Sequence, residues 1–228
     1  MTKEDMLGVI NDMMADIILK TYSDPIHAKD WEQLRNDLIK VEEGIRKCDA
    51  AGDEADNSPE AEKHEPSFEV RPYREGDLPQ MVDIWNEVVD GGAEFPDETR
   101  LGNLSGRKFF SSQTVAAVAV DDYDRTVAGL YILHPNNIGR CGHLCNASFA
   151  VRSGFRGQHI GEMLVKDCLE QAPKYGFRVL MFNAVVEDNA PAIHLYEKLG
   201  FVSLGTVPGG FRTSGGIYKD ILLFYHTL

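Results

Sequence analysis

The chain has 228 residues, enough for one ordinary domain and an extension, and its 43% hydrophobic content is sufficient for a packed core. Its formal net charge of -13 opposes binding to nucleic acid, and the absence of an apolar run of eighteen residues opposes a membrane span. Four cysteines and no recognisable export signal favour free thiols in the cytoplasm.

Two amphipathic segments open the chain. Apolar residues recur at helical spacing from Met6 to Ile18, and again from Trp31 to Ile45 after the turn at Ser23-Asp24-Pro25. This pattern predicts a helical hairpin over residues 1–50, followed by a flexible acidic linker over residues 51–66. We expect the hairpin to cover an apolar surface of the following domain or to pair in a homodimer. A regulatory or partner-binding role is the alternative.

The remaining residues, 67–228, show strand and helix patterns in the order of an α/β domain. Strands are expected at 68–73, 114–120, 126–133, 142–151, 177–186, 201–206 and 218–225. Helices are expected at 77–89, 98–104, 162–175 and 190–199, the last with Asp188 as its N-cap. This order predicts an α/β sandwich, a mixed sheet flanked by helices, with a cleft where two central strands splay apart.

A glycine-rich turn joins the strand that ends at Val151 to the helix that follows. Gly157 and Gly161 allow the backbone to come close to a ligand, because no Cβ obstructs it. Arg156 offers a planar donor fork, and the helix N-terminus adds partial positive charge. The turn is therefore expected to hold phosphate, although it has neither the G-x-G-x-x-G nor the P-loop spacing.

Two motifs resemble those of the GNAT N-acetyltransferases. The run Arg156-Gly157-Gln158-His159-Ile160-Gly161 resembles the pyrophosphate loop of that family, Arg/Gln-x-x-Gly-x-Gly/Ala. His159 stands where the first glycine is usual, and we expect its φ to stay negative. The run Asn189 to Phe201 resembles the family pattern Asn-x-x-A-x-x-L-Y-x-K-x-G-F. The resemblance covers residues 67–228 and implies the acyl-CoA N-acyltransferase sandwich fold.

A third stretch, His134 to Phe149, resembles a subgroup of this family. The best-known member of the subgroup is the fungal L-azetidine-2-carboxylate acetyltransferase, which acts on proline-like imino acids. The shared features are Pro-Asn, Arg-Cys-x-His, Cys-Asn-Ala before the loop, and Phe-Asn in the next strand. This resemblance implies that Asn146 is the main active-site side chain and that Asn183 holds the substrate.

The family resemblance also implies an acetyl-CoA site and a direct transfer without a metal. Tyr196 is expected to protonate the departing thiolate, with a role in core packing as the alternative. Glu94, in a loop that borders the acceptor in this family, is expected to steer or deprotonate a cationic amine, or else to be solvated. The groups expected to contact acetyl-CoA are Phe149, Ala150, Val151, Arg156, Gly157, Gln158, His159, Ile160, Gly161 and Asn189.

Three further residues have weaker functional interpretations. Cys141, His143 and Cys145 alternate, so on a strand they would share one face. Zinc takes four ligands and no second pair lies near, so packing is favoured over metal binding. His143 as a base and Cys145 as an acyl-accepting nucleophile are alternatives to packed or hydrogen-bonded strand residues.

The favoured function is acetyl transfer from acetyl-CoA to the amine of a small molecule, with amino and imino acids as candidates. No nucleic-acid or membrane partner is expected. Protein or peptide N-acetylation within the same fold, and CoA binding without turnover by a regulatory protein, are the alternatives.

Overall fold

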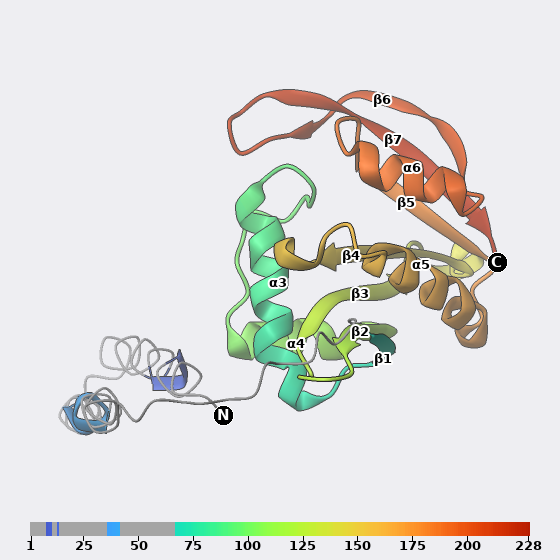
Figure 1. The fold of residues 1–228 in the computed structure, drawn as a ribbon. Coiled ribbons are helices and arrows are strands. Elements are labelled where there is room, and N and C mark those ends of the chain that lie inside the picture. The colour runs from blue at the N-terminus through green and yellow to red at the C-terminus, as the bar shows by residue number, and fades with distance from the viewer. Residues whose placement is uncertain (1–7, 11–12, 14–35, 42–66) are drawn as a thin grey trace. The chain divides into compact units, whose positions relative to one another are not determined.

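A computed structural model describes residues 8–10, 13, 36–41 and 67–228 of the chain (Figure 1). The chain divides into two compact units, Met1–His64 and Glu65–Leu228. In the first unit the described residues are helical, at positions where helices are expected. The remainder of the expected hairpin, and the expected acidic linker, lie outside the described residues.

The second unit contains a seven-stranded sheet in the order β1-β2-β3-β4-β5-β7-β6. All neighbouring strands are antiparallel except β4 and β5, which are parallel. The strands are β1 (Phe68–Pro72), β2 (Val115–Asp121), β3 (Val127–Pro135), β4 (Leu144–Val151), β5 (Val179–Val186), β6 (Val202–Arg212) and β7 (Tyr218–Thr227). The α-helices are α3 (Leu78–Gly91), α4 (Asn103–Ser111), α5 (Ile160–Gln171) and α6 (Ala190–Lys198). The predicted mixed sheet flanked by helices is confirmed.

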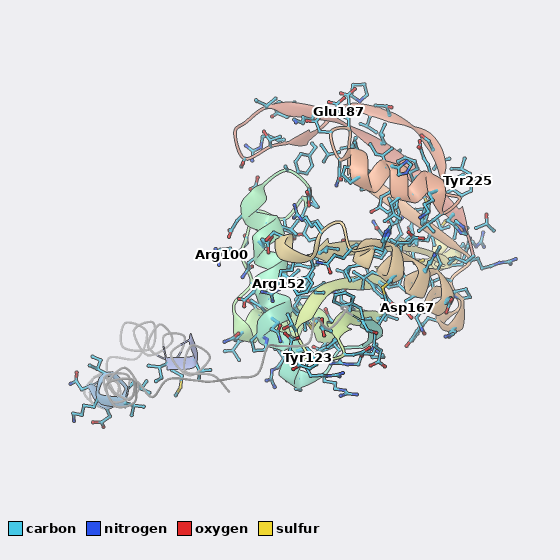
Figure 2. All side chains as sticks on the ribbon, in the orientation of Figure 1. Arg100, Tyr123, Arg152, Asp167, Glu187 and Tyr225 are labelled. Atoms are coloured by element: carbon cyan, nitrogen blue, oxygen red, sulfur yellow. The ribbon has the colours of Figure 1, made fainter. Side chains whose placement is uncertain are left out.

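The two larger hydrophobic cores form because successive strand residues point to opposite faces of the sheet. On one face Leu164 of α5 packs with Leu133 of β3 and Ala147 of β4. This α5 face also holds Tyr131, whose hydroxyl donates a 2.7 Å hydrogen bond to Asp167 of α5, labelled in Figure 2. On the other face, the α3 face, residues of α3 and α4 pack with Leu130, Ile132, Ala150 and other strand residues.

The sheet opens between its two parallel strands. β4 and β5 pair only at Leu144–Val179 and Cys145–Leu180. From Asn146 onward β4 continues along β3, whereas β5 continues along β7 (Figure 1). The splayed central strands that the sequence predicts therefore exist, and they part at Asn146.

Two expected helix boundaries are wrong. The helix expected at 98–104 is instead α4, which begins at Asn103, because Gly102 is extended and its N–H donates to the Ser105 hydroxyl at 2.8 Å. The helix expected to reach Tyr175 ends as an α-helix at Gln171 and continues as the 3-10 turn Ala172–Tyr175, where Pro173 lacks a backbone N–H. None of the helices in the described residues is long and apolar enough to span a membrane.

The loop between α3 and α4 is held against the β6–β7 hairpin. Gly92 ends α3 with φ of 59°, and a Cβ there would lie 2.6 Å from the Cβ of Ser214, so glycine is needed for both reasons. The Ser214 N–H donates to the Gly92 carbonyl at 3.2 Å, and Arg212 pairs with Glu98 at 2.7 Å. These contacts fix the loop near the open end of the sheet, beside a cavity of about 430 Å³ lined by Val89, Gly92, Phe95, Pro96, Asp97, Glu98, Gly210, Phe211, Arg212 and Ser214.

Candidate active site

A glycine-containing turn joins β4 to α5 as expected, but His159 in this turn adopts another conformation than predicted. Its φ is 62°, in the left-handed region, so the expectation of a negative φ is wrong. His159 is the N-cap of α5, and its carbonyl accepts a 3.1 Å hydrogen bond from Met163. The chain needs a left-handed residue to turn into α5 at this point, which is the physical reason that glycine is usual there.

The loop leaves its backbone open to a ligand. Gly157 has φ of 80°, and a Cβ placed on it would meet no atom within 4 Å. A Cβ on Gly161 would make only ordinary contacts, 3.6 Å from Leu195 and 3.9 Å from Val151. The arrangement suits a diphosphate, because the first N–H groups of a helix have no partner within the helix and space beside Gly157 is open.

The side chains of the loop divide into exposed and buried ones. Arg156, Gln158 and His159 are exposed, and the Nε–H of Arg156 donates a 3.4 Å hydrogen bond to the Val151 carbonyl. Ile160 is 1% exposed and packs in the core beneath α5. Ile160 therefore contributes through its backbone and through the position of the helix.

Glu162 stands in the first turn of α5, where a carboxylate would repel an anionic ligand. Its oxygens lie 2.8 Å from the Lys166 ammonium and 2.6 Å from the Lys198 ammonium. Hydrogen bonds from these two lysines lower the pKa of Glu162 to about 2. The pairs balance the negative charge at the helix N-terminus and link α5 to α6.

Asn189 begins α6, the helix that carries Tyr196. Its side-chain oxygen accepts a 3.2 Å hydrogen bond from the Ala192 N–H, so Asn189 is the N-cap and the expectation of Asp188 in that role is wrong. Asp188 instead pairs with Lys219. Because the cap uses the amide oxygen of Asn189, its NH₂ group is the part that can donate to a ligand carbonyl.

Tyr196 combines a packed ring with a hydroxyl that can donate. The ring lies 4.3 Å from Phe182, 5.4 Å from Phe201 and 6.1 Å from Phe224, between ring centroids. Burial raises the pKa of Tyr196 well above its usual range. The hydroxyl is therefore protonated at neutral pH, and no described residue hydrogen-bonds it, so it is available as a proton donor.

A group of neutral polar side chains lies on the α3 face where β4 and β5 part. Asn146 alternates with the buried Cys145 and Ala147 of the α5 core, so it points to the α3 face. Asn183 of β5 alternates likewise with the buried Phe182. The structure thus brings Asn146 and Asn183 to the same face of the sheet, on the two sides of the opening.

Asn136, just after β3, orients Asn183. The Asn183 amide donates a 2.5 Å hydrogen bond to the side-chain oxygen of Asn136, and the Asn136 amide donates to the Met181 sulfur at 3.7 Å. A thioether can only accept, so this contact turns the Asn136 oxygen toward Asn183. The carbonyl oxygen of Asn183 consequently faces away from Asn136 and can accept from a bound donor.

Glu94 lies in the α3–α4 loop and is exposed. It lines a cavity of about 240 Å³ together with Glu87, Val88, Gly91, Ala93 and Arg156. Glu94 therefore lies close to the loop that carries Arg156.

The expectation that Cys141, His143 and Cys145 share a strand face is wrong. Cys141 lies in the 3-10 turn Gly139–Cys141 and is exposed, and His143 precedes β4, so only Cys145 is in the strand. Burial raises the pKa of the Cys145 thiol to about 12, so it is not a nucleophile at neutral pH. Within the described ranges no group of three His, Cys, Asp or Glu residues could hold a metal ion.

The fold and the loop define the class of protein. Residues 80–201 match the acetyltransferase (GNAT) family, and the chain belongs to that family. It is an N-acetyltransferase, and the family uses acetyl-CoA, which solved structures of the same fold contain.

Among individual relatives, N-acetyltransferase aca1 of Schizosaccharomyces pombe is 35% identical over 158 residues, which cover 62% of this chain and 76% of that protein. A GCN5-related N-acetyltransferase from Kribbella flavida has 32% sequence identity and a TM-score of 0.65, covering 71% of this chain and 98% of that one. A phosphinothricin acetyltransferase from Sinorhizobium meliloti, solved with acetyl-CoA, shares the fold at 22% identity and a TM-score of 0.65, covering 71% and 88%.

Two residues on the α3 face were not anticipated from the sequence, namely His134 and Asn136. His134 stands opposite Asn146 in the register of β3 and β4. The sequence indicated this only weakly. His134 and Asn136 are two residues apart at the end of β3, so they would point to the same face if the strand alternation continued. The pairing of β3 with β4, which joins His134 to Asn146, depends on contacts between distant residues.

Proposed function

We propose that this protein transfers the acetyl group of acetyl-CoA directly to the amine of a small molecule, and that its acceptors are amino or imino acids. The observation that carries the proposal is the set of neutral amides, Asn136, Asn146 and Asn183, on the α3 face where β4 and β5 part. Amides can donate and accept at once, which suits an acceptor that carries both N–H and carboxylate groups.

In this proposal the phosphate loop binds the pyrophosphate and Asn189 donates to the pantetheine arm. Backbone groups of Phe149, Ala150 and Val151 are proposed to orient the thioester, since residues of β4 beyond Asn146 have no β5 partner. Asn146 holds the acceptor or the tetrahedral oxygen. Proximity of amine and thioester can supply roughly 7–11 kcal/mol of the barrier, so orientation accounts for much of the rate.

The thiolate leaves on the opposite face of the sheet. Tyr196 belongs to the core on the α5 side, whereas Asn146 points to the α3 side. An acceptor on the α3 face would then attack from one side of the thioester, and Tyr196 would protonate the sulfur from the other. We propose this separation of acceptor binding from thiolate protonation because side chains of β4 alternate between the two faces and α6 carries Tyr196 on the α5 side.

We further propose that the acceptors resemble those of the L-azetidine-2-carboxylate subgroup. The support is the subgroup-like stretch from His134 to Phe149, which contains two members of the amide set, Asn136 and Asn146. We also propose a cytoplasmic location, because Cys141, Cys145 and Cys168 are free thiols.

The test is an acetyl-transfer assay over a panel of amines that includes proline analogues, other amino acids and short peptides, with the free CoA thiol as readout. Asn146→Ala should lower turnover by about 10²-fold or more, the scale seen when one oxyanion donor is lost. Acetyl-CoA affinity measured by calorimetry should stay unchanged. Asn137→Ala, an exposed residue of the β3–β4 loop, is the matched control.

Full activity of Asn146→Ala on the best acceptor would overturn the role of this residue. If only peptides were acetylated, the acceptor would be a peptide N-terminus and not a small molecule. Acetyl-CoA binding with no turnover of any amine would favour a regulatory CoA-binding protein.

A further inference from the structure

His134 and Asn146 occupy directly opposed positions in the antiparallel register of β3 and β4. Residues opposed in this way point to the same face of the sheet, with Cβ atoms about 4.5–5.5 Å apart. The neighbouring pair, Leu133 and Ala147, points into the α5 core, so His134 and Asn146 point to the opposite face. His134 therefore stands beside Asn146 on the α3 face and is half-buried there.

The three strands around the opening carry no Asp, Glu, Lys or Arg. Apart from His134, their titratable side chains are Tyr131 and Cys145, and both point into the α5 core. Burial raises the pKa of Tyr131 and of Cys145, so neither takes up a proton from an amine at neutral pH. His134 is the single group on this face of β3, β4 and β5 that can accept a proton.

Charged groups also come from the elements that border this face. Glu87 of α3 accepts a 3.0 Å hydrogen bond from the Ser153 N–H and lines the cavity of about 240 Å³ together with Glu94. The α3–α4 loop carries the exposed carboxylates Glu94, Asp97 and Glu98, and the β6–β7 hairpin carries Arg212. Glu98 and Arg212 are paired with each other at 2.7 Å, and Glu94 lines the cavity beside the phosphate loop. These groups can attract a cationic amine, but none of them is on β3, β4 or β5, the strands around Asn146.

The imidazole of His134 has its basic nitrogen free. Its Nδ1 lies 3.0 Å from the carbonyl oxygen of Pro135. A carbonyl oxygen only accepts hydrogen bonds, so Nδ1 carries the proton and the lone pair of the neutral ring is on Nε2. The contact also limits rotation of the ring, and Nε2 makes no hydrogen bond with any described residue.

We infer that His134 is the general base of the reaction, an assignment that rests on the function proposed above. The His134 Nε2 takes a proton from the ammonium form of the acceptor, which frees the nitrogen lone pair. That lone pair forms the C–N bond to the acetyl carbon as the C–S bond of the thioester breaks. The second nitrogen proton passes to water, and the thiolate gains a proton from Tyr196. The neighbouring amides of Asn146 and Asn183 position the nitrogen, but they cannot take its proton.

The experiment compares His134→Gln with the unaltered protein on the best acceptor of the amine panel. We expect kcat to fall by about 10²–10⁴-fold, the usual contribution of a general base. In the unaltered protein kcat/KM should decrease with falling pH, and this decrease should be lost in the variant. Acetyl-CoA affinity by calorimetry should not change. Added imidazole should restore part of the rate of His134→Ala, which a structural role would not predict.

His143→Gln is the matched control, because His143 is exposed, precedes β4 and has no partner in the register with β3. An unaltered protein that transfers acetyl groups, together with a His134→Gln variant of equal rate and pH dependence, would overturn the base and leave the proposed function intact. An unaltered protein that binds acetyl-CoA but acetylates no amine would overturn both. If circular dichroism shows that His134→Gln does not fold, the rate of His134→Ala with added imidazole becomes the test. If imidazole does not raise that rate, the assignment is refuted.

Discussion

At the scale of single residues, the roles that we propose separate proton transfer from binding. The amides Asn146, Asn183 and Asn189 can hold groups without changing charge, whereas His134 and Tyr196 can move protons on opposite faces of the sheet. Burial keeps Tyr196 protonated, and the Pro135 carbonyl keeps Nε2 of His134 available. This division allows a base and an acid to act on one reaction without neutralising one another.

Replacing Tyr196 by Phe tests its hydroxyl separately from its ring. The ring contacts with Phe182 and Phe201 remain in Tyr196→Phe, so the melting temperature should stay close to that of the unaltered protein. The rate should fall by about 10²-fold because the thiolate loses its donor. Tyr175→Phe, at an exposed tyrosine, is the control. A lower melting temperature with an unchanged rate would show that Tyr196 only packs.

His159→Gly tests the left-handed residue at the start of α5. A side chain in this region costs roughly 1–2 kcal/mol, and the larger freedom of glycine in the unfolded chain takes back about 0.5–1 kcal/mol. The free energy of unfolding should therefore increase by about 0.5–1 kcal/mol. Arg125→Gly, at a second left-handed position with φ of 65° in the β2–β3 turn, should give a similar gain.

If the His159 side chain contacts a CoA phosphate, His159→Gly will weaken acetyl-CoA binding while Arg125→Gly will not. Calorimetry of both variants separates the conformational role from the contact. A decrease in the stability of both variants in denaturant would contradict the strain argument.

At the scale of elements, a buried ion pair fixes α3 to β1 and so positions the loop that carries Glu94. Arg71 of β1 lies 2.7 Å and 2.9 Å from the two oxygens of Asp77, and both residues are at least nine-tenths buried. The Arg74 N–H also donates to Asp77 at 2.7 Å. Burial alone would raise the pKa of Asp77, but the hydrogen bonds from Arg71 and Arg74 outweigh it and hold the pKa below its usual value of 3.8.

The lowered pKa of Asp77 determines how the free energy of unfolding changes with pH. The unfolded chain binds a proton to Asp77 more readily, so this stabilisation is complete above the unfolded value of 3.8 and is lost as the pH falls through the lower folded value. Asp77→Asn should lower the free energy of unfolding by about 3 kcal/mol at neutral pH, since it leaves Arg71 without its charge partner. The difference from the unaltered protein should shrink in acid.

Denaturant unfolding between neutral pH and pH 3 measures this difference. Asp90→Asn is the control, because its pair with Arg100 is exposed and should contribute at most about 1 kcal/mol. A penalty for Asp77→Asn that grows as the pH falls would contradict the assigned direction.

At the scale of the whole molecule, the chain divides into the units Met1–His64 and Glu65–Leu228. We propose that residues 67–228 form the complete catalytic domain, that residues 1–50 form a non-catalytic helical hairpin, and that residues 51–66 link them. The compact unit Glu65–Leu228 supports the first part of this proposal, because both cores of the sheet lie within it.

A protein that begins at Glu65 should bind acetyl-CoA with the affinity of the full chain. We expect it to lose solubility, stability or dimerisation, because the hairpin is proposed to cover apolar surface in the monomer or the homodimer. Calorimetry and sedimentation of both proteins measure these effects. Equal solubility, stability and mass in solution would refute the covering role and favour a freely tethered arm.

The sequence by itself determined the elements and motifs whose information is local. Glycine spacing, a strand before the loop and a helical pattern after it predicted the phosphate-binding loop from Arg156 to Gly161. Strand and helix periodicity predicted the α/β order of residues 67–228, and the motif around Tyr196 placed that residue on a helix. These signals depend on neighbours within about one helical turn or a few strand residues, so a single stretch of chain contains them.

Only the tertiary structure decided which residues of different strands share a face and which backbone conformation His159 adopts. The register of β3 with β4 sets His134 beside Asn146, and the early end of the β4–β5 pairing exposes both to the opening. A shift of one residue in this register would have brought another β4 residue beside His134, because the pairing between two strands sets the partner of each residue. Likewise, the packing of α5 on the sheet imposed a left-handed His159, against the preference of a residue with a side chain.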